Sequence, residues 1–142
     1  SDVYKRQVVD TCCVSPFDLA VDVRDMVVLA DGTLLAATGW GIYRDPTGEG
    51  AWEPSSGGLG NFDVWRLAVH PTDSRWILAG CSGKVASPGW LYLSADGGRS
   101  WSEVGSTLRA RRVTGLVWSD PSVLEAVALL EWSGAWRLRL RP

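Results

Sequence analysis

Short runs of alternating apolar and polar residues, separated by turns rich in Gly, Asp and Pro, recur along the chain from Val21 onward. Met26–Leu29 and Thr33–Thr38 are two such runs, joined by a hairpin turn at Ala30-Asp31-Gly32. Ile42–Arg44 follows as a third short run. Alternation over so few residues is typical of strands with one buried face, so the pattern predicts an all-β protein.

The pattern also repeats over a longer period. Aligning Trp52 with Trp101 gives an offset of 49 residues, and the same offset superposes three further apolar pairs: Leu59 and Leu108, Val64 and Val113, Leu67 and Leu116. An earlier unit is shorter, with 41 residues from Val23 to Val64. Periods of about 40–50 residues with four short strands are typical of β-propeller blades. We therefore expect an incomplete propeller over 8–142, with about two to three blades near 21–60, 61–110 and 111–142.

The last unit contains the one ambiguous element. Val123–Leu130 is rich in Leu, Ala and Glu and favours a helix on propensity alone. Its place in the repeat matches the strand expected at Trp76–Ala79, so we predict a strand. The sequence ends before another strand-closing loop, and we expect the remaining blades to be missing from this chain. Open blade edges at both ends of the arc predict self-association of the chain when it is expressed alone.

One stretch carries a recognisable motif. Residues 94–101, SADGGRSW, match the pattern S-x-D-x-G-x-[ST]-W at its five defining positions: Ser94, Asp96, Gly98, Ser100 and Trp101. The motif resembles the Asp-box, or BNR repeat, of propellers in sialidases, xyloglucan-cleaving hydrolases, sortilin-type receptors and a photosystem assembly factor. In those families the box closes the turn between the third and fourth strands of a blade and has a structural role. Asp45–Trp52 looks like an eroded second copy.

The resemblance implies a ligand face at the opposite end of the blades. That face is built from loops entering each first strand and loops joining strands two and three; here these are Val21–Asp25, Gly60–Asp63, Arg109–Arg112 and Cys81–Gly89. Asp25 and Asp63 are the candidate catalytic carboxylates, because a glycosidase needs two carboxyl groups that flank the glycosidic bond of its substrate. The other ligand-face candidates are Asp22, Arg24, Lys84, Arg109, Arg111 and Arg112. The alternative is that these charged residues are simply exposed to solvent in their loops and bind no ligand.

The aromatic residues and the histidine are less specific. Trp40, Trp65 and Trp90 would stack on sugars if they were exposed on the ligand face, or pack between blades if buried. His70, before Pro71, is expected to be a turn residue. The leading function is therefore a non-catalytic binding or scaffold propeller that recognises a protein or a glycan. The alternative is part of a secreted glycoside hydrolase, sialidase-like or xyloglucanase-like, and a third possibility is an assembly factor for a membrane complex.

Composition narrows the function classes. The 142 residues are 46% hydrophobic and carry a net charge of −2, which gives no basis for a nucleic-acid partner. No apolar run is long enough to span a membrane, and no phosphate-binding loop or metal-ligand spacing is present, so no cofactor or metal is expected. Cys12, Cys13 and Cys81 are expected to be free thiols. The alternative is one disulfide between Cys81 and either Cys12 or Cys13.

The first seven residues, SDVYKRQ, resemble translated sequencing-adapter read-through, and we leave them out of fold reasoning as a non-native leader. The sequence leaves the cellular compartment open, and the family resemblance favours a secreted or periplasmic protein.

Overall fold

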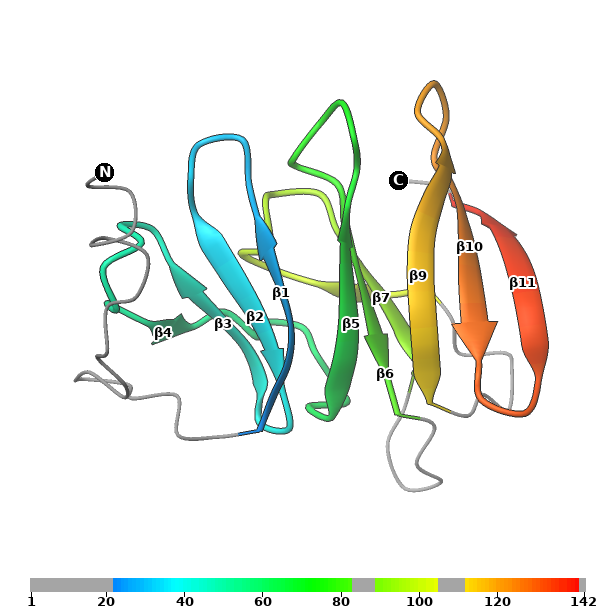
Figure 1. Ribbon diagram of the computed structural model, residues 1–142, viewed down its shortest axis with the longest axis horizontal. Helices are drawn as coiled ribbons and strands as arrows, with labels where there is room; N and C mark the ends of the chain where they lie inside the picture. The colour runs from blue at the N-terminus through cyan, green and yellow to red at the C-terminus, as the bar shows by residue number, and fades with distance from the viewer. Residues whose placement is uncertain (1–21, 83–88, 105–111, 141–142) are drawn as a thin grey trace, which may run out of the picture.

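The computed structural model describes residues 22–82, 89–104 and 112–140, in which every regular element is a β-strand (Figure 1). The first blade has the order β1-β2-β3-β4, with β1 Val23–Val28, β2 Leu34–Thr38, β3 Gly41–Asp45 and β4 Glu53–Pro54. The second has the order β5-β6-β7-β8, with β5 Val64–Val69, β6 Ile77–Cys81, β7 Leu91–Ser94 and β8 Ser102–Glu103. The third contains β9 Val113–Asp120, β10 Glu125–Leu130 and β11 Gly134–Arg139. All pairs within the blades are antiparallel.

The predicted strands and their repeat are confirmed. β5 and β9 begin at Val64 and Val113, the pair aligned by the 49-residue offset. Val123–Leu130 forms a strand over most of its length, since β10 begins at Glu125. The predicted start of the first strand was late, because β1 begins at Val23 and includes the charged pair Arg24-Asp25 that interrupts the apolar pattern.

The blades stack face to face, and two apolar clusters fill the spaces between them. Leu35, Ala37 and Ile42 of the first blade pack with Ile77, Ala79 and Cys81 of the second. Leu78 and Leu91 of the second blade pack with Ala126 and Ala128 of the third. Alternate residues of β6 therefore face opposite neighbours, and all five of its residues are buried. The second blade is the centre of the molecule.

Because the blades stack by their faces, the outer end of the third blade exposes a sheet face. This corrects the expectation of an open strand edge at that end. On the outer face of the third blade, Val117 is 57% and Leu129 47% exposed. The ion pairs of Glu125 with Arg137 (3.9 Å) and Arg139 (3.2 Å) flank this apolar surface.

The blades have two distinct ends. The entry end, at the bottom of Figure 1, is where β1, β5 and β9 begin and where β2–β3 and β10–β11 turn. The hairpin end, at the top, carries the β1–β2, β5–β6 and β9–β10 turns. Antiparallel pairing also brings the loops after β3 and β7 to the hairpin end.

The 94–101 loop is closed by its own side chains. Ser94 Oγ donates a hydrogen bond to Asp96 (2.8 Å) and accepts one from the Gly98 backbone N–H (2.8 Å). Asp96 also accepts the backbone N–H groups of Arg99 (3.1 Å) and Ser100 (2.9 Å). Trp101 Nε1 donates to the Ser55 carbonyl (2.9 Å), which ties this loop to the first blade.

The 45–52 loop is also closed by side-chain hydrogen bonds, but from a different residue. Asp45, at the position of Ser94 in the repeat, accepts backbone N–H groups from Thr47 (3.0 Å), Gly48 (2.9 Å) and Gly50 (2.7 Å). One buried carboxylate thus replaces the Ser-and-Asp pair of the other loop.

Candidate ligand-binding site

The three innermost strands share a β-bulge at the same place. The register of β1 with β2 shifts between Val23 and Asp25, and that of β5 with β6 shifts between Val64 and Arg66. In the third blade Leu129 pairs with Gly115 and Leu130 with Val113, which leaves Thr114 as the extra residue. The bulged residues Arg24, Trp65 and Thr114 are therefore equivalent. A bulge re-aims its side chain, and bulges are common beside functional sites.

Side chains from all three blades meet at the entry end around Trp65. The Arg24 guanidinium carbon lies 3.9 Å from the centroid of the Trp65 ring, and that of Arg112 lies 4.3 Å from it. The two cations come from the blades on either side, and two guanidinium groups at these distances do not fit over one ring face. They therefore cover both faces of the indole, each in a cation–π contact.

Carboxylates balance these arginines. Arg24 pairs with Asp63, and its Nε lies 3.0 Å from Asp22 Oδ2. Arg112 pairs with Glu131 at 2.5 Å. Burial alone would lower the pKa of Arg24, but the hydrogen bonds and charges of Asp63 and Asp22 outweigh it and raise the pKa. Two arginines and three carboxylates thus form a network of ion pairs at the entry end, with one carboxylate in excess.

Asp63 is held as a carboxylate. Burial alone would raise its pKa, but hydrogen bonds from Arg24 and Trp65 lower it, together with the Arg24 charge. The Trp65 Nε1 donor lies 3.4 Å from Asp63 Oδ2. A general acid of a glycosidase needs the opposite shift, a pKa raised toward neutrality.

Asp25 lies within β1 and joins two blades. Its Oδ2 accepts the backbone N–H of Leu67 in β5 (2.9 Å), and its Oδ1 accepts that of Met26 (2.9 Å). Arg66, the equivalent residue of the second blade, donates from Nε to the Thr114 carbonyl (3.1 Å). Both side chains bind the next innermost strand. Asp25 and Asp63 therefore hold the scaffold, and the described residues give no support to a glycosidase pair.

The remaining candidates from the sequence lie in different parts of the chain. Asp22, Arg24, Asp63 and Arg112 come together at the entry end, whereas Lys84, Arg109 and Arg111 lie outside the described residues. His70 is buried at the other end, where its Nδ1 lies 3.3 Å from both the Thr72 backbone N and its Oγ1, as a turn residue would.

The tryptophans also differ from one another. Trp90 is buried between blades, and Trp65 has both faces covered, so neither offers a stacking surface to a sugar. Trp40, in the β2–β3 turn, is 67% exposed.

Sequence reasoning did not single out several residues of this end. Phe62 is 49% and Trp132 85% exposed, and Glu131 is the partner of Arg112. The signal for Trp132 and Glu131 was their place between two strands of the third unit, which corresponds to the β2–β3 turn of the first. Phe62 lies inside the expected 60–63 loop, where the sequence prediction rests on the charged residues alone.

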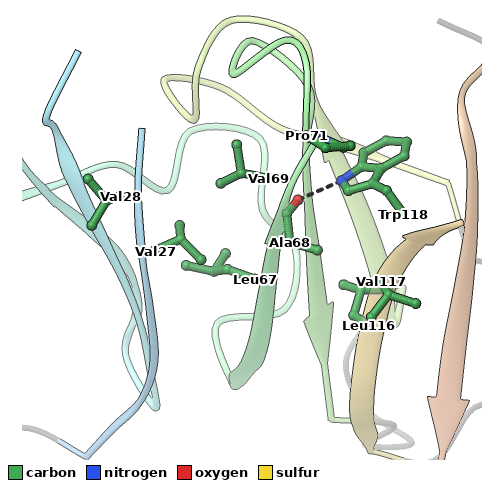
Figure 2. A pocket seen from close by; sticks show the side chains of 9 residues that line it. All are labelled: Val27, Val28, Leu67, Ala68, Val69, Pro71, Leu116, Val117 and Trp118. Atoms are coloured by element: carbon green, nitrogen blue, oxygen red, sulfur yellow. Dashed lines mark hydrogen bonds between the residues drawn. The ribbon is translucent and has the colours of Figure 1, made fainter. Parts of the chain in front are cut away.

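An apolar groove runs across the innermost strands, in the half nearer the hairpin end (Figure 2). Its volume is about 470 Å³, and its lining comes from Val27 and Val28 of β1, Leu67–Val69 of β5, Pro71, and Leu116–Trp118 of β9. Trp118 Nε1 donates to the Ala68 carbonyl across the β5–β9 boundary (2.9 Å). None of the side chains that line it is titratable, so the groove offers shape and apolar contact, without acid–base chemistry.

Cys81 is a free, buried thiol on β6, and burial raises its pKa to about 12, with the Asp63 charge adding to the effect. Cys12 and Cys13 lie outside the described residues. Within the described ranges, no group of three or more His, Cys, Asp or Glu side chains is placed to hold a metal ion. No described helix is long and apolar enough to cross a membrane.

Comparison with known proteins finds a solved structure of similar fold. No protein-family model matches the sequence, and no curated protein matches it either. The structure is similar to a solved one described as YCF48 bound to D1 peptide, with a TM-score of 0.62 over 87% of this chain. The two sequences are 18% identical, and the match spans 38% of the YCF48 chain. The chain therefore has the fold of part of a β-propeller.

Proposed function

We propose that this chain is part of a non-catalytic propeller that recognises a protein segment at its entry end. One observation carries the proposal: all three blades contribute arginine or large aromatic side chains to that end. Arg24, Trp65 and Arg112 form its centre, and the exposed Trp40, Phe62 and Trp132 belong to the same end. Tryptophan and arginine are the residues most enriched among the energetically dominant contacts of protein interfaces.

A protein ligand fits this surface better than a glycan. Sugars bind proteins by stacking on a free aromatic face, and at the centre of this surface both faces of Trp65 are covered. The exposed Trp40 and Trp132 at its margin suit either kind of ligand. The network is also close to charge balance, which suits the mixed polar and apolar surface of a peptide. In the similar solved structure YCF48 is bound to D1 peptide, so a propeller of similar fold can bind a peptide. We further infer that the 94–101 loop is a structural Asp-box.

Display selection of random peptides on the folded chain tests the proposal, with the D1 peptide of the YCF48 structure as a second probe. Binding is then measured by fluorescence anisotropy for Arg112→Ala and Trp40→Ala, which alter exposed or half-exposed side chains. Each variant should weaken binding about tenfold, as expected when an interface anchor is truncated. Arg75→Ala at the hairpin end is the control and should leave binding unchanged. Selected peptides that tolerate both entry-end variants would overturn the proposal.

A further inference from the structure

A cavity of about 200 Å³ lies between the first and second blades at the hairpin end. Leu29 and Ala30 at the β1–β2 turn give it an apolar wall, and Gly97 leaves part of that wall without a side chain. Three arginines also line it, Arg44 from the end of β3 and Arg75 and Arg99 from the second blade. The remaining lining residues are Asp31, Ser74 and Asp96. The cavity is at the opposite end from the proposed protein-binding surface and is independent of it.

Arg44 is the unusual member of this lining. The residue is only 7% exposed, and its Nε has no hydrogen-bond partner. None of the ion pairs found in the described part of the chain includes it. A buried donor without a hydrogen-bond partner is unfavourable. The guanidinium is therefore placed to bind an anion from outside the chain.

The nearby carboxylates are already occupied. Asp31 accepts the Thr33 backbone N–H (2.9 Å), and this hydrogen bond, with a further contribution from the Arg44 charge, lowers its pKa. Asp96 accepts N–H groups of its own loop. Arg75 pairs with Asp73 at 2.7 Å, so its charge is largely satisfied. Arg44 feels Asp31 electrostatically but makes no direct pair with it.

We propose that this cavity binds a small aliphatic monocarboxylate. The planar guanidinium of Arg44 matches a carboxylate in a bidentate arrangement, and a short apolar body lies against Leu29 and Ala30. Arg99 adds a second cation to the lining. Asp31 and Asp96 line the same cavity, and their negative charge disfavours a dianion such as phosphate.

The test is a titration of the full chain with isovalerate, acetate and inorganic phosphate, followed by ¹H–¹⁵N NMR. The Nε–H signal of Arg44 and the backbone amide of Gly97 report directly on the cavity. Isovalerate should shift both signals saturably and bind at least about threefold more tightly than acetate, because it buries more apolar surface. Phosphate should bind more weakly than either.

Variants provide the second readout. Arg44→Gln should reduce isovalerate affinity about tenfold, and Arg99→Gln about threefold; the exposed Arg99 also serves if the Arg44 variant fails to fold. Arg137→Gln, which changes an exposed arginine of the third blade outside this cavity, is the matched control and should leave the affinity unchanged. Three results would overturn the proposal: phosphate binding more tightly than isovalerate, no saturable shift at Arg44 or Gly97, or an affinity indifferent to both Arg44→Gln and Arg99→Gln.

Discussion

At the scale of single residues, the same turn is built from two different chemistries. The 94–101 loop shares its hydrogen bonds between Ser94 and Asp96, whereas the 45–52 loop concentrates them on Asp45. Burial alone would raise the pKa of Asp45, but hydrogen bonds from Gly50, Thr47 and Gly48 outweigh it and lower the pKa. The carboxylate form of Asp45 is therefore part of the folded structure.

Asp45→Asn should lower the free energy of unfolding at pH 7 by about 1–3 kcal/mol, because a buried charged acceptor of several N–H groups is lost. Since the folded pKa lies below the unfolded value, the contribution of Asp45 is present above the unfolded pKa, about 4. It is lost as the pH falls through the folded pKa. Urea unfolding at pH 7, 5, 4 and 3 should therefore show the difference between wild type and variant shrinking below pH 4.

Glu49→Gln is the control for this experiment. Glu49 is an exposed residue of the same loop, and its replacement should change stability by less than about 0.5 kcal/mol. A wild-type-to-Asp45→Asn difference that stays constant between pH 7 and pH 3 would show that the carboxylate charge is not what stabilises the loop.

At the scale of strands, the innermost strand of each blade has two structural roles. Its bulged second residue points into the entry-end cluster in the first two blades, and its third residue there binds the neighbouring strand through Asp25 or Arg66. The rest of the strand supplies the apolar groove along the inside of the arc. One strand thus connects the candidate site with blade-to-blade packing.

Close packing between strands is most demanding at Gly80 in β6. A Cβ added there would lie 2.5 Å from Val113 Cγ1 of β9, so Gly80→Ala should destabilise the chain by about 1–3 kcal/mol. Val113→Ala in the same chain removes Cγ1, the closest atom, and leaves Cβ at 2.7 Å, so it relieves the contact in part. The double variant should therefore be more stable than the sum of the single effects predicts, by at least about 0.5 kcal/mol in denaturant unfolding.

Gly57→Ala controls for the loss of backbone freedom, because its added Cβ would meet only the Arg99 carbonyl at an ordinary 3.7 Å. It should cost far less than Gly80→Ala. Strictly additive effects of Gly80→Ala and Val113→Ala would mean that the two strands do not meet as closely as described.

The sequence predicted the strands because alternation and turn residues are local signals. It also predicted the repeat, because Val64 and Val113 begin equivalent strands. It placed Asp25 in a loop and suggested catalysis, because nothing local shows that its oxygens accept the N–H of a strand 42 residues away. The cation–π contacts on Trp65 could not be predicted from the sequence either, since they depend on Arg24 and Arg112 from two other blades.

At the scale of the whole molecule, stability is shared unevenly among the blades. Both faces of the second blade are buried, whereas the first and third each pack one face against it. Such stacking resembles that of repeat proteins, in which each unit contacts only its neighbours. The outer face of the third blade is the clearest consequence, because Val117 and Leu129 there remain exposed.

Exposed apolar sheet faces of this kind favour association. We therefore expect the 142-residue chain to self-associate through the outer face of its third blade, with a sedimentation mass that rises with protein concentration. Val117→Lys combined with Leu129→Lys should shift the mass toward that of the monomer, because like charges would meet across the contact. Val104→Lys, which changes an exposed apolar residue on the outer rim of the second blade, should leave the association unchanged. A wild-type chain that sediments as a monomer at every concentration would show that these side chains are no association surface, and that the arc is stable with this sheet face exposed to water.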